Sequence, residues 1–436
     1  MTTAPKKELS LFDSTCIIVG IIIGAGIYEN APAIAACMGT SLRTLGIWLA
    51  GGLFALTGAL CYAELATAYP REGGDYVYLS RAYGRWAGYL FGFSQIIIIR
   101  PGDIALMGFI FARYANTLYP FPHATVVYAV AVVIVLTLIN ILGVKQGKWT
   151  QNILTVIKAA GLLAIIIAAL FADAPRATIE PGETSLPGLQ LALILVMFTY
   201  GGWNEMAYVA AEVKHQKRNI VRALLTGTLA VTVLYLLINS AFIYTLGFEQ
   251  MASSSAVATD SVAAVFPNTA GKLVGILICI STLGAANGLI FTGSRISYAM
   301  GSEHTLFKPL GKWSSKLETP ARALIFQGFL ALAIVLAARS FIDTIIYTAP
   351  VFWLFLTASS ISIFVLRRRD KDILRPYKVT GYPFTIIIFC ASSIFMVYNC
   401  ISYAYTNKPR ALAIALVALT TGVVLYLLTN LSRRKS

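Results

Sequence analysis

Apolar stretches of about 20 residues recur from one end of the chain to the other. A helix of that length spans a bilayer, because each residue adds about 1.5 Å and the hydrocarbon core is about 30 Å thick. The recurring stretches therefore predict an all-α membrane protein with about twelve transmembrane helices. The predicted spans cover residues 11–37, 42–69, 86–118, 122–143, 149–171, 187–211, 220–247, 271–300, 322–339, 343–366, 382–404 and 410–430.

The composition supports a chain that is surrounded by lipid. Of its 436 residues, 58% are hydrophobic and only 12% are charged, whereas soluble domains carry about 25% charged residues. Helices that are apolar all round need lipid or a large core to cover them. The loops between the predicted spans are too short to hold a soluble domain. We therefore expect a single membrane domain over residues 1–436, in contact with membrane lipids.

Positive charge is distributed unevenly between the two sides of the predicted bundle. The formal net charge is +15. Assigning the loops alternately to the two sides puts about 24 Lys and Arg residues on one side and about 7 on the other. Loops rich in Lys and Arg stay in the cytoplasm, so we expect both termini on the cytoplasmic side of the cytoplasmic membrane. The charge is then a signal of topology, and we expect no nucleic-acid partner.

Two of the predicted spans are interrupted by glycine. The first contains Gly-Ala-Gly at 24–26 and the sixth contains Gly-Gly at 201–202, about 177 residues further on. Five spans separate equivalent points, so a second copy of the unit would lie inverted in the membrane. We therefore predict a first repeat over 11–171, an inverted repeat over 187–366 and two additional helices over 382–430. Inverted repeats with broken helices are typical of a binding site at the bilayer midplane.

The break at 24–26 suggests what such a site would bind. Unwound backbone in lipid leaves N–H and C=O groups without partners, so it must line a cavity or pack against protein. The half-helix after the break offers free N–H groups and a positive dipole end, which suit a carboxylate. The half-helix before it ends in free carbonyls, which suit an ammonium group. A broken helix can thus receive both ends of an α-amino acid, although close helix packing through small residues would also explain the glycines.

The second break is flanked by side chains that are unusual at membrane depth. Phe198 and Trp203 are suited to cap a site beside Gly201 and Gly202. Asn204 can donate a hydrogen bond across a break. Glu205, the next residue, is costly in lipid unless it is paired or hydrated.

Several segments resemble the amino acid–polyamine–organocation superfamily, and its L-type amino-acid transporter branch in particular. The resemblance spans nearly the whole chain, and its motifs occur in the family's order. They are GIIIGAGIY at 20–28, ELATAYPREGGDYVY at 64–78, IRP at 99–101, FTYGGWNE at 198–205, STLGAANG at 281–288 and RPYKVTGYP at 375–383.

This resemblance implies a LeuT-type fold, with ten core helices in a 5+5 inverted repeat and broken helices 1 and 6. By analogy, backbone N–H groups of residues 24–27 bind the substrate carboxylate, carbonyls of Ile22, Phe198 and Gly201 bind the ammonium, Phe198 is an aromatic gate, and Asn204 braces the sixth helix. The predicted substrate-binding residues are Ile22, Ile23, Gly24, Ala25, Gly26, Ile27, Phe198, Gly201, Gly202, Trp203 and Asn204.

Lys158 lies in the fifth predicted span. The resemblance implies that this lysine stands where sodium-coupled relatives hold a cation, bridging the first break to Ser281 or Thr282. We expect it to replace sodium, either as a proton carrier or as a fixed charge that supports exchange. The alternative is a lysine that extends its stem toward the inner interface.

Three carboxylates fall near the predicted membrane interior, namely Glu29, Asp103 and Glu205. They would select a cationic substrate if they faced the site. Pairing with Arg100 or Arg295 would instead make them structural, because intramembrane carboxylates usually have a partner.

The sequence thus predicts a secondary active transporter of small neutral L-amino acids, working by alternating access. We expect it to be sodium-independent, either an exchanger or proton-coupled. The first alternative is a transporter of cationic amino acids or polyamines. The second is a nutrient receptor that binds without transporting, although such a receptor would usually carry a soluble signalling domain.

Other functional classes lack sequence support. We expect no enzymatic activity, cofactor or metal, because no nucleophile–base pair, metal-ligand cluster or nucleotide loop is apparent. The six cysteines form no C-x-x-C pair. The resemblance also bears on partners, because L-type transporters bind a heavy subunit through a cysteine between helices three and four. Residues 116–125 contain no cysteine, so we expect no disulfide-linked heavy subunit.

Overall fold

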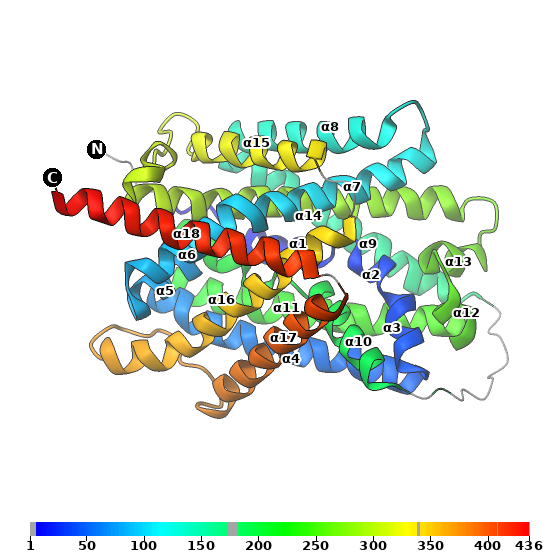
Figure 1. Cartoon of the computed structure of the whole chain (residues 1–436). Helices are drawn as coiled ribbons and strands as arrows, with labels where there is room; N and C mark the ends of the chain where they lie inside the picture. The colour runs from blue at the N-terminus through cyan, green and yellow to red at the C-terminus, as the bar shows by residue number, and fades with distance from the viewer. Residues whose placement is uncertain (1–5, 173–181, 183, 338–340, 408, 436) are drawn as a thin grey trace.

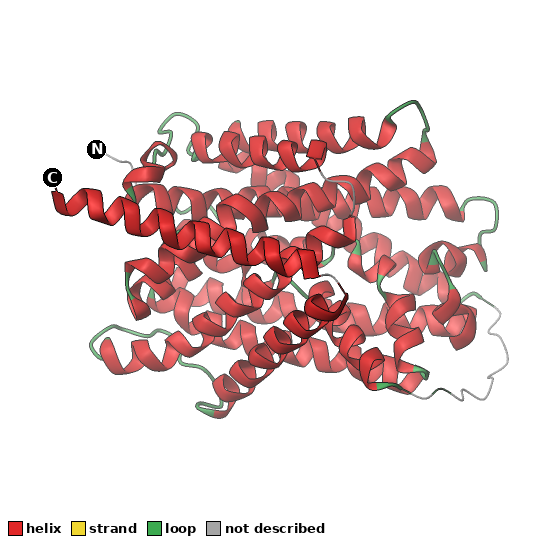
Figure 2. Cartoon of the chain, in the orientation of Figure 1, coloured by secondary structure: helices red, strands yellow, loops and turns green. Residues whose placement is uncertain are grey.

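The chain is helical throughout the part that the structure describes (Figure 2). The structure is a computed structural model, and it describes residues 6–172, 182, 184–337, 341–407 and 409–435. Among these residues the only β-type pairings are two isolated bridges, Leu9 with Val213 and Ser314 with Thr319. The prediction of an all-α protein is confirmed.

The long helices coincide with the predicted spans. Ten described helical stretches are long and apolar enough to cross a bilayer, and two shorter apolar helices, Ala321–Leu336 and Ala415–Thr429, lie in the remaining two predicted spans. The helices in these spans are α1 (Leu11–Ile22), α2 (Gly26–Glu29), α3 (Ala31–Met38), α4 (Ser41–Ala68), α6 (Arg85–Ser94), α7 (Arg100–Leu118), α8 (Ala124–Ile141), α9 (Val144–Ala169), α10 (Leu186–Thr199), α11 (Gln216–Leu246), α14 (Ala270–Glu303), α15 (Ala321–Ala337), α16 (Phe341–Arg369), α17 (Phe384–Asn407) and α18 (Pro409–Lys435).

Shorter elements complete the described chain. They are α5 (Asp75–Tyr83), η1 (Gln95–Ile99), η2 (Trp203–Glu212), α12 (Phe248–Ser253), α13 (Val257–Ala263) and η3 (Thr305–Leu310). The π-helical turn η1 precedes Pro101, whose nitrogen cannot donate to the carbonyl four residues back. The Arg100 N–H donates to the carbonyl of Gln95, five residues earlier. This wider turn keeps α6 and α7 in one continuous rod.

Helix α1 occupies the centre of the bundle. It packs against α9, α11, α14 and η2, while α4 packs along α11 and α7 along α14. In Figure 1, α8 and α15 lie at one side of the bundle, and both chain ends are marked at the same end of it.

That same end of the bundle is tied together by backbone and ionic contacts. The Leu9 N–H donates to the Glu212 carbonyl at 2.9 Å, and the Lys214 N–H donates to the Leu9 carbonyl at 2.8 Å. Glu212 also forms a buried two-point ion pair with Arg295, with oxygen–nitrogen distances of 2.7 and 3.0 Å. The segment before α1 is therefore fixed to the end of η2.

Candidate functional site

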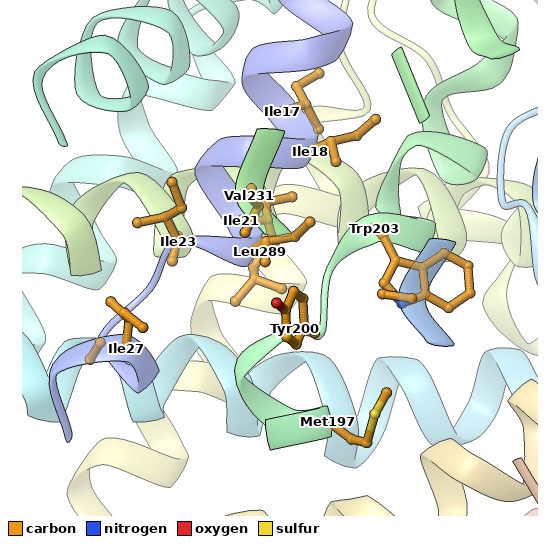
Figure 3. Close-up of a cluster of buried hydrophobic side chains, with 14 of the residues drawn as sticks. Ile17, Ile18, Ile21, Ile23, Ile27, Met197, Tyr200, Trp203, Val231 and Leu289 are labelled. Atoms are coloured by element: carbon orange, nitrogen blue, oxygen red, sulfur yellow. The ribbon is translucent and has the colours of Figure 1, made fainter. Parts of the chain in front are cut away.

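The first break separates α1 from α2. The helix ends at Ile22, and Ile23 takes φ −75° and ψ 80°, which is outside the helical region. Among the described residues, the N–H groups of residues 25–27 have no hydrogen-bond partner. Figure 3 shows the unwound backbone running from Ile23 to Ile27. These N–H groups are free because they stand at the start of α2, which begins at Gly26, and the first turn of a helix has no carbonyls before it to accept them.

The second break separates α10 from η2 and passes close to the first. Gly202 has φ +117°, which side chains other than glycine rarely tolerate. A Cβ at this position would lie 2.7 Å from Cγ2 of Ile21 and 3.2 Å from the nitrogen of Ile22. Glycine is therefore required both for the turn and for the close approach of the two breaks.

A single tyrosine hydroxyl connects the two breaks. Tyr235 of α11 donates to the Ile22 carbonyl at 2.9 Å and lies 3.3 Å from the Thr199 carbonyl. At the other end of the first break, Asn30 Nδ2 donates to Thr199 Oγ1 at 2.9 Å. Because each break is held by side chains from other helices, the unwound backbone keeps a fixed shape.

The two breaks line one cavity of about 140 Å³. A single water occupies roughly 10–15 Å³ on this measure, so the cavity has room for a ligand about as large as ten waters. The predicted residues that line it are Ile22, Gly24, Ala25, Gly26, Phe198, Gly201, Gly202, Asn204, Asp103 and Glu205. The size and the backbone groups suit an α-amino acid.

Three predicted substrate-binding side chains do not line this cavity. Ile23 and Ile27 are fully buried elsewhere. The Ile23 N–H donates to the Val19 carbonyl and its own carbonyl accepts from Lys158, so of these two residues only Ile27 offers a backbone group at the break. The Trp203 ring packs against Tyr62 and Phe389, at centroid distances of 5.1 and 5.6 Å, and in Figure 3 it points away from Leu289. Gly58 makes room for the ring there, since a Cβ on Gly58 would lie 2.5 Å from it. Trp203 therefore supports η2 from behind and does not cap the cavity.

Other lining residues were missed from the sequence. They are Ile21, Ile99, Leu106, Met107, Ile194, Met197, Thr199, Ala285, Leu289, Ala349, Phe352 and Trp353. Most come from α7, α14 and α16. These helices are unbroken where they line the cavity, so nothing in their local sequence marks these residues as part of a site. The spacing of Ile99, Asp103 and Met107, each four residues apart on one helix face, is the one pattern that could have indicated them.

Lys158 is not among the residues that line this cavity, and it is completely buried. Its Nζ donates to the carbonyls of Gly20 at 2.8 Å, Ile23 at 2.9 Å and Ser281 at 2.8 Å. The lysine thus joins the end of α1 to α14, and it does not extend its stem to the interface. It meets the carbonyl of Ser281 and not the hydroxyl, which lies 3.3 Å from the Tyr28 hydroxyl.

Thr282 is not a partner of Lys158. Its hydroxyl donates to the carbonyls of Ile278 and Cys279 in its own helix. A helical threonine commonly satisfies its hydroxyl in this way, so Thr282 contributes to α14 alone.

The three carboxylates have different surroundings. Glu29 pairs with Arg113 and Tyr114 and does not line the cavity. Glu205 lines the cavity but accepts from Arg100 at 2.6 Å and from Thr292 Oγ1 at 2.6 Å. Arg295, the other arginine considered, pairs with Glu212.

Asp103 also lines the cavity. Among the described residues, no hydrogen bond or ion pair to its carboxylate is found.

Asn204 links the cavity to a buried polar network at the end where both termini lie. Its Nδ2 donates to the Tyr208 hydroxyl at 3.1 Å, and that hydroxyl donates to Asp75 Oδ2 at 2.7 Å. Tyr62 donates to the other oxygen of Asp75. The Asn204 side chain thus bonds within η2 and does not reach across the break, while Tyr208 and Asp75 join η2 to α5 and α4.

In the described part of the chain, ten helical stretches are of membrane length, and two of them are broken at positions that face each other. This arrangement defines a multi-pass membrane protein of the transporter class. The family described as Amino acid permease matches residues 9–427. The chain belongs to this family, within the amino acid–polyamine–organocation superfamily, and is a transporter and not an enzyme.

Characterised relatives cover most of the chain. It is 34% identical to the b(0,+)-type amino acid transporter 1 of Mus musculus, over 89% of this chain and 81% of the relative. It is 32% identical to the serine/threonine exchanger SteT of Bacillus subtilis, over 90% of each chain. It is 30% identical to the large neutral amino acids transporter small subunit 2 of Mus musculus, over 98% of this chain and 81% of the relative. The resemblance to L-type transporters is confirmed.

Proposed function

We propose that this protein exchanges small neutral L-amino acids across the cytoplasmic membrane, independently of sodium and by alternating access. The observation that carries the proposal is the cavity where the two breaks meet, lined by backbone groups without partners. The names of two relatives support the substrate class and the mode of transport, since one is a serine/threonine exchanger and another a transporter of large neutral amino acids.

Backbone groups recognise the two charged ends of the substrate in this proposal. The N–H groups of Ala25, Gly26 and Ile27 receive the carboxylate, because they stand at the start of α2 and have no other partner among the described residues. The ammonium is received at the end of α1, by the carbonyl of Ile22, which already accepts from Tyr235, and by carbonyls of the second break. Phe198, a half-buried lining residue, covers the bound substrate.

Lys158 supplies the positive charge that sodium would otherwise supply. Its ammonium is surrounded by three carbonyl oxygens from two helices, an arrangement that also suits a bound cation. Because the charge is already present, the end of α1 can be held against α14 without sodium. Ser281 takes part through its backbone, and Thr282 has no part in the coupling.

The remaining features complete the proposal. The packing of α4 along α11 and of α7 along α14 supports two inverted repeats, because these are equivalent helices of the two units. Both ends of the chain at one end of the bundle (Figure 1) support an even number of spans. The excess of Lys and Arg in the loops at that end supports cytoplasmic termini. We expect no disulfide-linked heavy subunit.

Counterflow into proteoliposomes tests the proposal. Purified protein is reconstituted, and uptake of radiolabelled L-serine is measured with and without internal L-serine, in sodium and in choline buffer. We expect uptake only with internal substrate and equal rates in the two buffers. Uptake into empty vesicles driven by an inward proton gradient would favour proton symport, and absence of both uptake and binding would overturn the proposal.

A further inference from the structure

We propose that Asp103 forms a subsite for a positively charged substrate side chain, so that the transporter also accepts cationic amino acids. The inference rests on the proposed function, since it assumes that the α-carboxylate and α-ammonium of the substrate occupy the two breaks. To the proposed function, the inference adds the chemical class of the substrate side chain and names the residue that selects this side chain.

The position of Asp103 on α7 directs it into the cavity. Ile99, Asp103 and Met107 lie four residues apart and all line the cavity, as expected for one face of a helix. Met107 lies against the first break, because a Cβ on Gly24 would be 3.8 Å from its sulfur. Asp103 stands about one helical turn, or about 5.4 Å, along the axis from Met107. A side chain with the four-carbon stem of lysine can cover such a distance.

The other polar side chains that line the cavity are already hydrogen-bonded within the protein, so Asp103 is the one that can bind a substrate side chain. Thr199 is engaged with Asn30 and with the carbonyl of Leu195. Asn204 donates to Tyr208, and Glu205 accepts from Arg100 and Thr292, as described above. For the Asp103 carboxylate, no hydrogen bond or ion pair is found in the described part of the chain. The rest of the lining is mainly apolar, so a carboxylate there gains most from a cationic partner.

The charge balance around the cavity points the same way. Arg100 is buried and faces Glu205 at 2.6 Å, with Gln95 as a further partner at 3.0 Å. Within the described part of the chain its Nη1 has no hydrogen-bond partner, and this one arginine interacts electrostatically with two carboxylates, Glu205 and Asp103. Lys158 is engaged by three carbonyls. With both carboxylates ionised, the cluster of Arg100, Asp103 and Glu205 is one positive charge short of neutrality, and a cationic side chain would supply it.

Competition between two nearly isosteric amino acids tests the subsite. L-lysine and L-norleucine differ mainly in the terminal ammonium, so their ratio isolates the charge. Each competes with radiolabelled L-serine in the counterflow assay. For the wild type we expect L-lysine to inhibit at least as well as L-norleucine. For Asp103→Asn we expect the half-inhibitory concentration of L-lysine to rise about tenfold or more, since a charge-assisted hydrogen bond is lost, and that of L-norleucine to change less than about twofold.

A matched control and a binding assay separate the outcomes. Glu249→Gln removes an exposed carboxylate outside the cavity, so it should leave the lysine-to-norleucine ratio unchanged. Thermal stabilisation of purified protein by each amino acid gives the same ratio without transport. Exchange of L-serine with no inhibition by L-lysine, or an equal effect of Asp103→Asn on both competitors, would overturn the subsite alone. Absence of all exchange and binding would overturn the proposed function.

Discussion

Lys158 is a completely buried residue whose partners are all backbone carbonyls. Three acceptors surround its Nζ at 2.8–2.9 Å, namely Gly20 of α1, Ile23 directly after α1 and Ser281 of α14. A hydrogen bond from a charged donor stabilises a buried site more than one from a neutral donor. Without the lysine, these carbonyls would be buried without a hydrogen-bond partner. The residue therefore bears on both the shape of the first break and the position of α1.

We expect Lys158→Met to lower the exchange rate at least about tenfold while the protein still folds, because methionine keeps the approximate length of the stem without the charge. Counterflow of L-serine measures the rate, and size-exclusion chromatography in detergent checks the fold. Lys145→Met is the matched control, since Lys145 is an exposed residue of the same helix. Wild-type exchange by the Lys158 variant would contradict a coupling role.

The ion pair between Arg100 and Glu205 can be tested by measuring the stability of single and double variants. Both side chains are buried, at 3% and 5% exposure, so removing one partner leaves an uncompensated charge. We expect Arg100→Leu alone to cost about 3–5 kcal/mol of stability, because it leaves the Glu205 carboxylate without its cationic partner. Arg100→Leu with Glu205→Leu should cost less than that. Melting temperatures in detergent measure both, and a double variant less stable than Arg100→Leu would argue against the pairing.

At the scale of elements, the helix breaks depend on two glycines for different reasons. Gly202 needs its positive φ and has a side chain of α1 within 2.7 Å of any added Cβ. Gly24 has no such constraint, because the nearest atom to an added Cβ is 3.7 Å away, on Ala285. An alanine at 24 therefore fits but projects into the cavity.

We accordingly expect Gly202→Ala to yield little folded protein, whereas Gly24→Ala folds and binds substrate at least several-fold more weakly. Yield of monodisperse protein and the melting temperature report the first effect. The concentration dependence of L-serine counterflow reports the second. Normal folding of the Gly202 variant would show that the turn does not require the positive φ.

The sequence predicted the helices better than their ends. Helix α9 begins at Val144, whereas the apolar stretch begins near 149, because polar residues such as Lys145 and Lys148 continue the helix beyond the hydrocarbon core. Hydropathy marks only the part of a helix that lies in lipid. The amphipathic helix α5 was missed for the same reason, since its mixed composition does not resemble a span.

The breaks were predictable because glycine pairs within apolar stretches are a local signal, and both lie at the positions expected. The other walls of the cavity were not. Met107, Leu289 and Phe352 line it from unbroken stretches of helix, and their role depends on how helices far apart in sequence pack together. The same limit applies to Trp203, whose ring turns toward Tyr62 because Gly58 leaves space there.

At the scale of the whole molecule, the segment before α1 closes one end of the bundle. Leu9 pairs with Val213 at the end of η2, and both are fully buried. Alternating access requires each end of the bundle to open in turn. This contact joins the two broken helices, so it must separate whenever the cavity opens at that end.

We expect oxidation of the Leu9→Cys, Val213→Cys double variant to form a disulfide, because residues paired in a β-bridge are close enough for one. The disulfide should lower the rate of counterflow about tenfold or more. Reduction should restore the rate. The control is Ser314→Cys with Thr319→Cys, a second bridged pair confined to one loop, whose cross-link should leave exchange intact. Undiminished counterflow by the oxidised Leu9–Val213 variant would contradict opening at this contact.

Because the Lys158 ammonium is covalently part of the chain, it affects what can drive transport. A bound sodium ion can be released on the far side of the membrane, so its downhill movement can drive a substrate uphill. An ammonium that belongs to the chain returns with the protein in every cycle. If it keeps its proton, no external gradient performs work, and each amino acid that enters must be matched by one that leaves. Such a protein can change which amino acids a cell contains, but it cannot by itself increase their total amount.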